Sequence, residues 1–268
     1  MAMQMTDAGT PYWVDGVGPT VIFVHGVLMD HRTWQYQVDG LSGDFRVVRI
    51  NMIGHGHCPG RAGERTLDEF VEQVHEAITH ICPDEMPVLV GFSMGGLVAQ
   101  AYAIARPSRL RALVLMNAVY NRTSEEQKSV RARLENLEEV GIQAVIGAAR
   151  ERWFRDDEAA EYADEIDVMM QWMRDGDLSA KTNAYRVFAT ADTHTAGKLG
   201  QISCPALVMT GDGDRGSPPH MSEAMAAEIP NARLRIFERQ QHMMPVLDAE
   251  HVNAELRDFF QSLPEKNV

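Results

Sequence analysis

Residues 88–96 read Val-Leu-Val-Gly-Phe-Ser-Met-Gly-Gly, and this stretch decides the fold. It joins an apolar run, Pro87–Phe92, to a small, apolar helical pattern, Leu97–Ala105, through a Gly-x-Ser-x-Gly turn. The motif alone is weak because Gly and Ser are common, but its position between a strand and a helix makes it informative. A serine on so tight a turn needs small neighbours, and its hydroxyl projects beside the unpaired N–H groups that begin the helix. We therefore expect Ser93 to be a nucleophile; the alternative is a glycine-rich turn that only packs a helix on a strand.

Similar apolar runs lie on both sides of this stretch. They are rich in Val, Ile and Leu, which suits strands buried on both faces of a parallel sheet. These runs are Thr20–His25, Val47–Asn51, Leu110–Met116, Ala206–Thr210 and Leu234–Phe237. Helical patterns lie between them, at Leu67–Ile81, Pro218–Glu228 and Ala249–Phe260. Strands alternating with helices predict an α/β protein with a mostly parallel, doubly wound sheet.

The alternation breaks between Tyr120 and Gly200, where the sequence is helical and polar. We expect residues 121–199 to form a helical cap over the strand ends, inserted before the late strands. Residues 1–120 and 200–268 would then form the α/β core. The alternative is that these helices are one more layer of the core.

Composition excludes several classes of protein. The 268 residues include 25 Lys and Arg against 38 Asp and Glu, for a net charge of −13 without a basic cluster, so nucleic acid is not an expected partner. No stretch approaches the ~20 apolar residues of a membrane span. The N-terminus lacks the basic and apolar regions of a secretory signal, and the three cysteines are far apart, so the cytoplasm is expected. No phosphate-binding loop or metal-ligand cluster occurs, so no metal or organic cofactor is expected.

A serine-dependent active site also needs oxyanion donors and a base. We expect these residues in loops that follow other strands of the sheet. Acyl transfer needs two N–H donors for the oxyanion, and we assign these to Met94, which follows Ser93, and to Val27, in the loop after the first strong strand. His25 in that loop is expected to be structural. Among ten histidines, only His242 follows a late strand at the same edge of the sheet as Ser93, so it is the expected base.

The acid that orients His242 is expected after the run Ala206–Thr210, where Gly-Asp-Gly-Asp spans residues 211–214. We favour Asp214, which lies further along the loop, over Asp212, which suits a turn. Asp248 could instead cap the last helix. The chain order is therefore Ser93, Asp214, His242, which matches the α/β-hydrolase arrangement.

These features together resemble the α/β-hydrolase family over nearly the whole chain. The matching stretches are Phe23–Gly26, Trp34, Gly54–Gly56, Gly91–Gly96, Cys204–Val208, Gly211, Asp214 and His242. The resemblance implies that Ser93 is the nucleophile, Asp214 the acid and His242 the base, with Val27 and Met94 as oxyanion donors. Asn51 replaces a frequent Asp and Cys58 a frequent Ser, which affects loop packing more than the triad.

Within this family the cap resembles the 3-oxoadipate enol-lactonase and carboxylesterase group. Arg152-Trp153-Phe154, Ala184-Tyr185 and Ala189–Asp192 carry this likeness. It implies a small-molecule ester or lactone as substrate. We expect Trp153, Met29 and Met243 to contact it, because aromatic rings and flexible thioethers form adaptable pockets.

The expected activity is hydrolysis of a carboxylic ester or (enol-)lactone by a Ser-His-Asp triad through an acyl-enzyme. One alternative is a carbon–carbon bond hydrolase of a vinylogous diketone, which can use the same triad. Another is a ligand receptor without activity on a hydrolase scaffold. Epoxide hydrolases and haloalkane dehalogenases are disfavoured because they have Asp where Ser93 stands. A homodimer is left open.

The charge of the cap bears on the substrate. Glu151–Asp177 holds three basic and ten acidic residues. Such a segment is either a solvated helix face or a barrier to anionic substrates. A dicarboxylate lactone would need an Arg in the cleft, and the sequence does not choose among Arg133, Arg150, Arg152 and Arg155.

Overall fold

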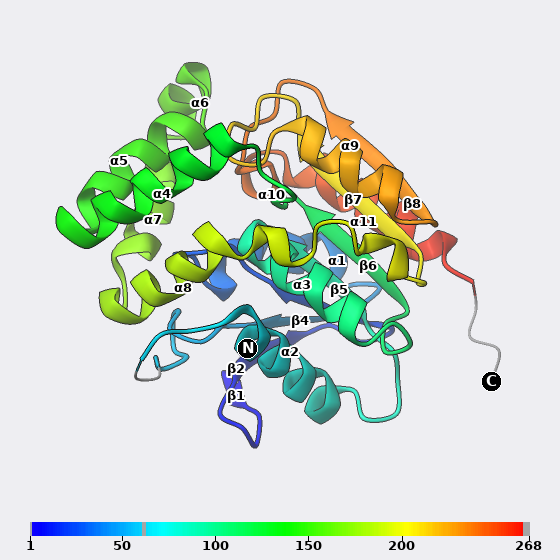
Figure 1. Ribbon diagram of the computed structural model, residues 1–268. Helices are drawn as coiled ribbons and strands as arrows, with labels where there is room; N and C mark the ends of the chain where they lie inside the picture. Colours follow the sequence, from blue (N-terminus) through cyan, green and yellow to red (C-terminus); the bar gives the residue numbers. More distant parts are fainter. Residues whose placement is uncertain (1, 61–62, 265–268) are drawn as a thin grey trace.

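The computed structural model describes residues 2–60 and 63–264. Eight strands form one sheet in the order β1-β2-β4-β3-β5-β6-β7-β8 (Figure 1). The strands are β1 (Gln4–Met5), β2 (Pro11–Asp15), β3 (Thr20–Val24), β4 (Arg46–Ile50), β5 (Val88–Phe92), β6 (Ala112–Met116), β7 (Ala206–Gly211) and β8 (Ala232–Phe237). Strands β3 to β8 pair in parallel, whereas β1 and β2 form an antiparallel edge that the sequence did not predict. The predicted mostly parallel α/β-hydrolase fold is confirmed.

The central strands form the core of the molecule. Every residue of β3, β5, β6 and β7 is buried, which explains their continuous apolar sequences. Helices cover both faces of the sheet (Figure 1). They are α1 (Gln35–Leu41), α2 (Leu67–Ile81), α3 (Met94–Ala105), α9 (Pro219–Glu228), α10 (Met244–Leu247) and α11 (Ala249–Ser262). Helix α2 begins as expected at Thr66, whose N–H donates to the Glu69 carboxylate at 2.9 Å in a capping box.

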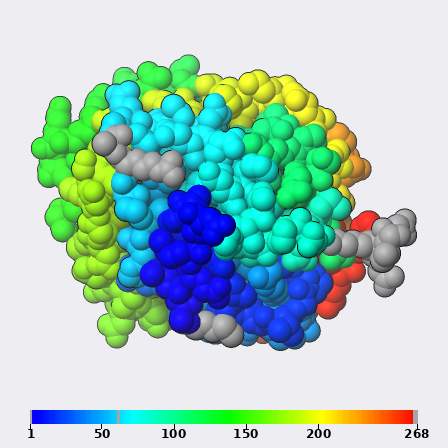
Figure 2. Space-filling view, turned by 90° about the horizontal axis from the view of Figure 1, so that it is seen from below, coloured from blue at the N-terminus to red at the C-terminus, as the bar shows by residue number. Residues whose placement is uncertain are grey.

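Five helices intervene between β6 and β7. They are α4 (Ser124–Glu139), α5 (Ile142–Trp153), α6 (Asp156–Glu161), α7 (Ala163–Arg174) and α8 (Leu178–Thr190). They stand together at one side of the sheet in Figure 1, and helices α4 and α8 pack against each other. Figure 2 shows a face formed largely by the first part of the chain, in blue and cyan, with these helices at its edge. We refer to α4–α8 as the cap.

A buried ion pair holds the two ends of the cap together. Arg122 precedes α4 and Asp192 follows α8, and each side chain is only 2% exposed. The Arg122 guanidinium donates to Asp192 at 2.9 Å, and the Arg122 backbone N–H donates to the other carboxylate oxygen at 2.9 Å. The guanidinium also donates to the Phe188 carbonyl at 3.0 Å. The cap therefore leaves the core and returns to it at one point.

Residues 2–60 and 63–264 contain no helix that is both long and apolar enough to cross a membrane. The same residues include no group of three or more His, Cys, Asp or Glu side chains arranged to hold a metal ion. Cys58, Cys82 and Cys204 are all buried.

Candidate active site

Ser93 lies on the turn between β5 and α3 in a strained conformation. Its φ is +53°, in the left-handed region that residues other than glycine rarely adopt. The turn is possible because its glycines lack side chains: a Cβ at Gly91 would come within 2.3 Å of the Gly95 carbonyl oxygen, and one at Gly95 within 2.3 Å of the Val24 carbonyl oxygen. The turn thus holds Ser93 rigidly at the carboxyl edge of the sheet.

The loop after β3 approaches Ser93 closely. A Cβ at Gly26 would lie 3.2 Å from the Cβ of Ser93, so only glycine lets the two backbones come this near. Val27 follows in this loop, and Met94 is the first residue of α3. Within the described chain, no hydrogen bond is donated by the backbone N–H of Val27 or of Met94. Two residues near the serine, the lining residue Val27 and its neighbour Met94, therefore keep an unused N–H group, the number of donors that an oxyanion needs.

Two buried histidines hold this loop in place. The Met52 N–H donates to Nε2 of His25 at 3.0 Å, and Nδ1 of His25 lies 2.8 Å from the Gly26 carbonyl. The Leu28 N–H donates to Nε2 of His55 at 3.1 Å. Burial lowers the pKa of His25 to about 4 and holds the pKa of His55 well below its ordinary value, so both rings are neutral and accept at Nε2. The contacts of His25 are those of a structural residue, and His55 has the same kind of role.

Asp214 and His242 form a buried pair, and His242 lines the same cavity as Ser93. Nδ1 of His242 lies 2.7 Å from the Asp214 carboxylate, which is only 2% exposed. The same carboxylate oxygen accepts from the Asn117 amide at 2.8 Å, and the other accepts from the N–H groups of Gly216 and Ser217 at 2.7 and 3.1 Å. Burial alone would raise the pKa of Asp214, but His242 and these hydrogen bonds outweigh it and lower the pKa. The carboxylate is therefore ionised and fixed toward the imidazole.

The other two carboxylates considered from the sequence lie elsewhere. Asp212 is exposed, and Asp248 pairs with His251 at 2.6 Å. Sequence reasoning missed Asn117, which directly follows β6 and has a φ of +47°. The available signal was a polar residue at the carboxyl end of a strand that neighbours β7.

A narrow, partly open cavity lies between the core and the cap. Its lining residues are Val27, Leu28, Ser93, Gly216, Ser217 and His242 from the core, and Arg133, Val145, Ala149, Arg152, Trp153, Met173, Tyr185 and Phe188 from the cap. The helices α4–α8 thus cover the carboxyl edge of the sheet where the serine lies. The cavity is mostly apolar, with a few polar groups at defined places, as ligand sites usually are.

The three residues expected to contact substrate are placed differently. Trp153 lines the cavity and stacks on His242, with ring centroids 5.4 Å apart. Met29 and Met243 are buried in the hydrophobic core and are not among the lining residues. Both lie one or two positions from a lining residue, and side-chain direction, which sequence spacing does not fix, decides which neighbour reaches the cavity.

Two arginines of the cap reach into this cavity without an acidic partner. Within the described chain, no carboxylate lies within 4.0 Å of the guanidinium of Arg152 or of Arg133. Nε of Arg152 is buried without a hydrogen-bond partner, and Nε of Arg133 donates only to the Tyr185 hydroxyl, at 3.3 Å. Burial and the nearby Arg133 lower the pKa of Arg152 to about 10, against the opposite effects of Tyr185 and Asp214. This pair is a ready binding site for an anion.

The other two arginine candidates lie on the outside. Arg150 pairs with Asp167, whose side chain is 68% exposed. Arg155 pairs with Asp157 at 2.9 Å and with Glu158 at 2.7 Å. The structure thereby separates four arginines that the sequence left equivalent: two in the cavity and two in outer ion pairs.

Comparison with known proteins agrees with this architecture. Residues 19–249 match the alpha/beta hydrolase fold family. The chain is 30% identical over 254 residues to an (E)-2-((N-methylformamido)methylene)succinate hydrolase from Acinetobacter baylyi, covering 94% of each chain. It is 27% identical over 242 residues to 3-oxoadipate enol-lactonase 1 from the same organism, covering 88% of this chain and 82% of the relative. The crystal structure of the enol-lactonase from Burkholderia xenovorans LB400 superposes with a TM-score of 0.88 and 23% identity, covering 97% of this chain and all of that one.

Proposed function

The chain belongs to the alpha/beta hydrolase fold family, and from this premise we propose that it is a serine hydrolase of a small ester or lactone that carries a carboxylate group. Hydrolase activity itself follows from the family and the relatives. The nature of the nucleophile, of the bond and of the substrate is our proposal. Its parts are argued separately below.

The proposed reaction proceeds through an acyl-enzyme. Ser93 attacks the carbonyl carbon while Nε2 of His242 takes its proton, and Asp214 stabilises the resulting imidazolium through Nδ1. The N–H groups of Val27 and Met94 bind the oxyanion of the tetrahedral intermediate. His242 then protonates the leaving oxygen, and in the second half it activates the water that releases the acid. The 2.7 Å contact between His242 and Asp214 and the strained turn at Ser93 support these roles.

One observation carries the substrate class: the half-buried Arg152 lines the cavity with a buried, unpaired Nε. Its Nη1 donates to the Ala148 carbonyl at 3.3 Å, and it has no acidic partner among the described residues. A buried cation without a counter-ion is costly, and a ligand carboxylate would relieve that cost through charge-assisted hydrogen bonds. The names of two relatives point the same way, since a substituted succinate carries two carboxylates and 3-oxoadipate is a dicarboxylate.

The succinate hydrolase from Acinetobacter baylyi suggests a second candidate for the bond that is cleaved. Its named substrate contains an N-methylformamido group and no ester, and it matches this chain over 94% of both lengths. Hydrolysis at an amidomethylene succinate would use the same anion site and the same serine. The remaining alternatives are a carbon–carbon bond hydrolase and a receptor without activity.

The test compares wild type with Ser93→Ala. We expect wild type to hydrolyse p-nitrophenyl butyrate, and to hydrolyse monomethyl succinate with a greater kcat/KM than methyl butyrate. Ser93→Ala should lower kcat by at least about 1,000-fold, as loss of a serine nucleophile does, with an unchanged circular dichroism spectrum. Ser222→Ala, a buried serine on α9 outside the cavity, is the control and should keep its activity.

Two outcomes would contradict the proposal. Undiminished turnover by Ser93→Ala would exclude the serine mechanism, and no turnover of any compound by wild type would favour the receptor. Identification of products from a panel of esters, enol-lactones, ring-cleavage diketones and amidomethylene succinates separates the candidate bonds.

A further inference from the structure

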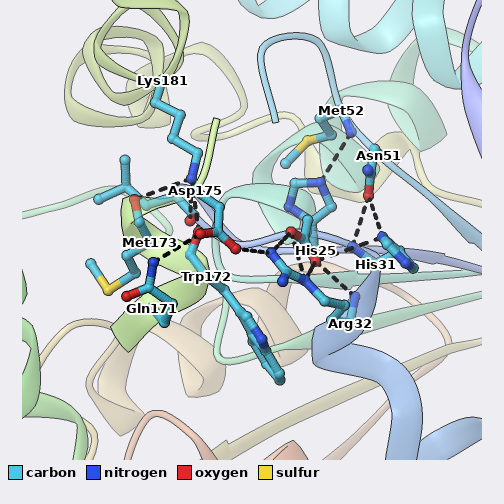
Figure 3. A network of polar contacts seen from close by, with 12 residues as sticks. His25, His31, Arg32, Asn51, Met52, Gln171, Trp172, Met173, Asp175 and Lys181 are labelled. Atoms are coloured by element: carbon cyan, nitrogen blue, oxygen red, sulfur yellow. Dashed lines mark hydrogen bonds and ion pairs between the residues drawn. The ribbon is translucent and has the colours of Figure 1, made fainter. Parts of the chain in front are cut away.

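Lys181, on α8, is a buried cation outside the proposed catalytic groups. It is only 1% exposed, and its ammonium donates to three backbone carbonyls: Trp172 at 2.9 Å, Met173 at 3.1 Å and Leu28 at 3.3 Å (Figure 3). An ammonium has three hydrogens, so these contacts use all of its donors. Within the described chain, no carboxylate lies within ion-pair distance of it.

The three carbonyls belong to two different parts of the molecule. Those of Trp172 and Met173 lie in the last turn of α7, where helical carbonyls lack partners and a cation is favourable. That of Leu28 lies in the core loop, one residue after Val27. The side chains of Leu28 and Met173 both line the cavity. Lys181 therefore connects the core wall of the cavity to its cap wall.

Leu28 is held from both sides in an unfavourable conformation. Its φ is +66°, in the left-handed region that costs an ordinary residue about 1–2 kcal/mol. Its N–H donates to His55 and its carbonyl accepts from Lys181. The Leu28 carbonyl shares a rigid peptide plane with the Met29 N–H, which donates to the Gly26 carbonyl at 3.2 Å. The Gly26 carbonyl in turn shares a peptide plane with the Val27 N–H, so the contact with Lys181 bears on the direction in which Val27 presents its N–H.

The charges around Lys181 do not offset the burial of its ammonium. The nearby carboxylates Asp30 and Asp175 are both engaged by Arg32, at 2.6 and 2.9 Å. Burial lowers the pKa of Lys181 to about 8, with Asp30 and Asp175 raising it and Arg32 lowering it further. The neutral histidines of the core loops, His25 and His55, complete the titratable surroundings. A lowered pKa means that the protonated side chain is less well stabilised in the folded protein than in water.

We propose that Lys181 is a positioning residue for hydrolysis: its ammonium fixes the Leu28 carbonyl, and thereby the Val27 N–H, while keeping α7 in register with the oxyanion loop. This rests on the proposed function, because only there does the Val27 N–H bind an oxyanion. A donor displaced by a fraction of an ångström stabilises the transition state less, whereas ground-state binding by the rest of the cavity changes little. The main effect of losing the ammonium is therefore on kcat.

The experiment replaces Lys181 with methionine, which keeps the chain length and removes the ammonium. With p-nitrophenyl butyrate we expect Lys181→Met to lower kcat by about 10–100-fold, less than the ~100–1,000-fold loss of an entire oxyanion donor, with KM changed less than about threefold. The matched control is Arg122→Met, which removes a buried cation at the other end of the cap and should keep kcat within about threefold. Rates are compared per folded molecule, well below each thermal midpoint.

The pH profile distinguishes positioning from packing. Below pH 8 the ammonium keeps all three hydrogens, and above it the amine has only two donors, so wild-type kcat should fall as pH rises through about 8. This alkaline decline should be absent in Lys181→Met. Lys181→Gln, whose amide donates two hydrogen bonds, should lose less kcat than the methionine variant and also lack the decline.

Either of two results would overturn the proposal that Lys181 is a positioning residue. These are a kcat of Lys181→Met equal to that of Arg122→Met, or an alkaline decline that persists in the folded variants. If Lys181→Met fails to fold, the comparison of wild type with Lys181→Gln decides. Failure of the proposed function is recognised separately, because wild type itself would then lack turnover that depends on Ser93.

Discussion

The two walls of the cavity differ in how far their polar groups are satisfied. On the core wall the Asp214 carboxylate accepts four hydrogen bonds, from His242, Asn117, Gly216 and Ser217. On the cap wall Nε of Arg152 is buried without any partner. The Asp214 carboxylate is therefore fully engaged within the protein, as a preorganised catalytic group should be, whereas Arg152 keeps a buried donor for which the described chain supplies no acceptor.

Helix α5 shows the same contrast within two residues. Arg150 points outward and pairs with Asp167, whereas Arg152 faces the cavity. Most of the acidic side chains of Glu151–Asp177 are exposed, and none of them lines the cavity. The negative charge that argued against an anionic substrate thus lies on a solvated face, while the positive charge lies inside.

The largest expected effect comes from damaging the core wall. Asp214→Asn removes the carboxylate that orients His242 and should lower kcat by about 1,000–10,000-fold. Because this wall serves the reaction and not the recognition of charge, charged and uncharged esters should lose activity equally. Steady-state kinetics with monomethyl succinate and methyl butyrate measure this. A loss confined to the charged ester would mean that the two walls are not separate in function.

A smaller and selective effect should come from the cap wall. Arg152→Met removes a charge-assisted contact worth about 1.5–3 kcal/mol, so kcat/KM for monomethyl succinate should fall about 10–100-fold. Methyl butyrate should be hydrolysed almost as well as by wild type. Arg150→Met, two residues away on the same helix, is the control and should change neither rate. Equal losses on both esters would refute a carboxylate site at Arg152.

The smallest effect should come from removing one hydrogen-bond donor to the Asp214 carboxylate on the core wall. Asn117→Ala removes one of the hydrogen bonds that lower the pKa of Asp214 and should cost about 2 kcal/mol of stability at neutral pH. A lowered carboxyl pKa contributes stability above the unfolded value, and this contribution is lost as pH falls through the folded pKa. The difference in thermal midpoint between wild type and variant should therefore shrink from pH 7 to pH 3. A constant difference would show that Asn117 acts by packing alone.

The fold was predictable because its signals are local. The fully buried strands read as continuous apolar runs, and the glycines around Ser93 mark a turn that larger residues would block. The edge strand β2 escaped prediction because it is short and its apolar residues, Tyr12 to Val14, lie between a proline and an aspartate. Ser93, Asp214 and His242 each follow a strand of the parallel sheet. Because parallel strands end at one edge, the three residues could be expected to lie close together.

The rest of the site depends on how helices rotate and pack. Arg150 and Arg152 look alike in sequence, and only the packing of α5 turns one inward. Lys181 reads as an ordinary helix-surface lysine until α7 and the Leu28 loop enclose it. Met29 was assigned to the substrate for its flexibility and position, but its side chain turns into the core. These distinctions are set by contacts between segments far apart in the chain.

The ion pair between Arg122 and Asp192 makes the cap an exchangeable module. Since both ends of residues 123–191 are fastened at the same place, a different helical segment can be grafted between these two residues without altering any strand connection. Such a graft would leave Ser93, Asp214 and His242 in place and would exchange Arg133, Arg152 and Lys181, so a lysine at the place of Lys181 must be kept. Directed evolution of new specificities should therefore begin inside this pair and leave the pair itself untouched.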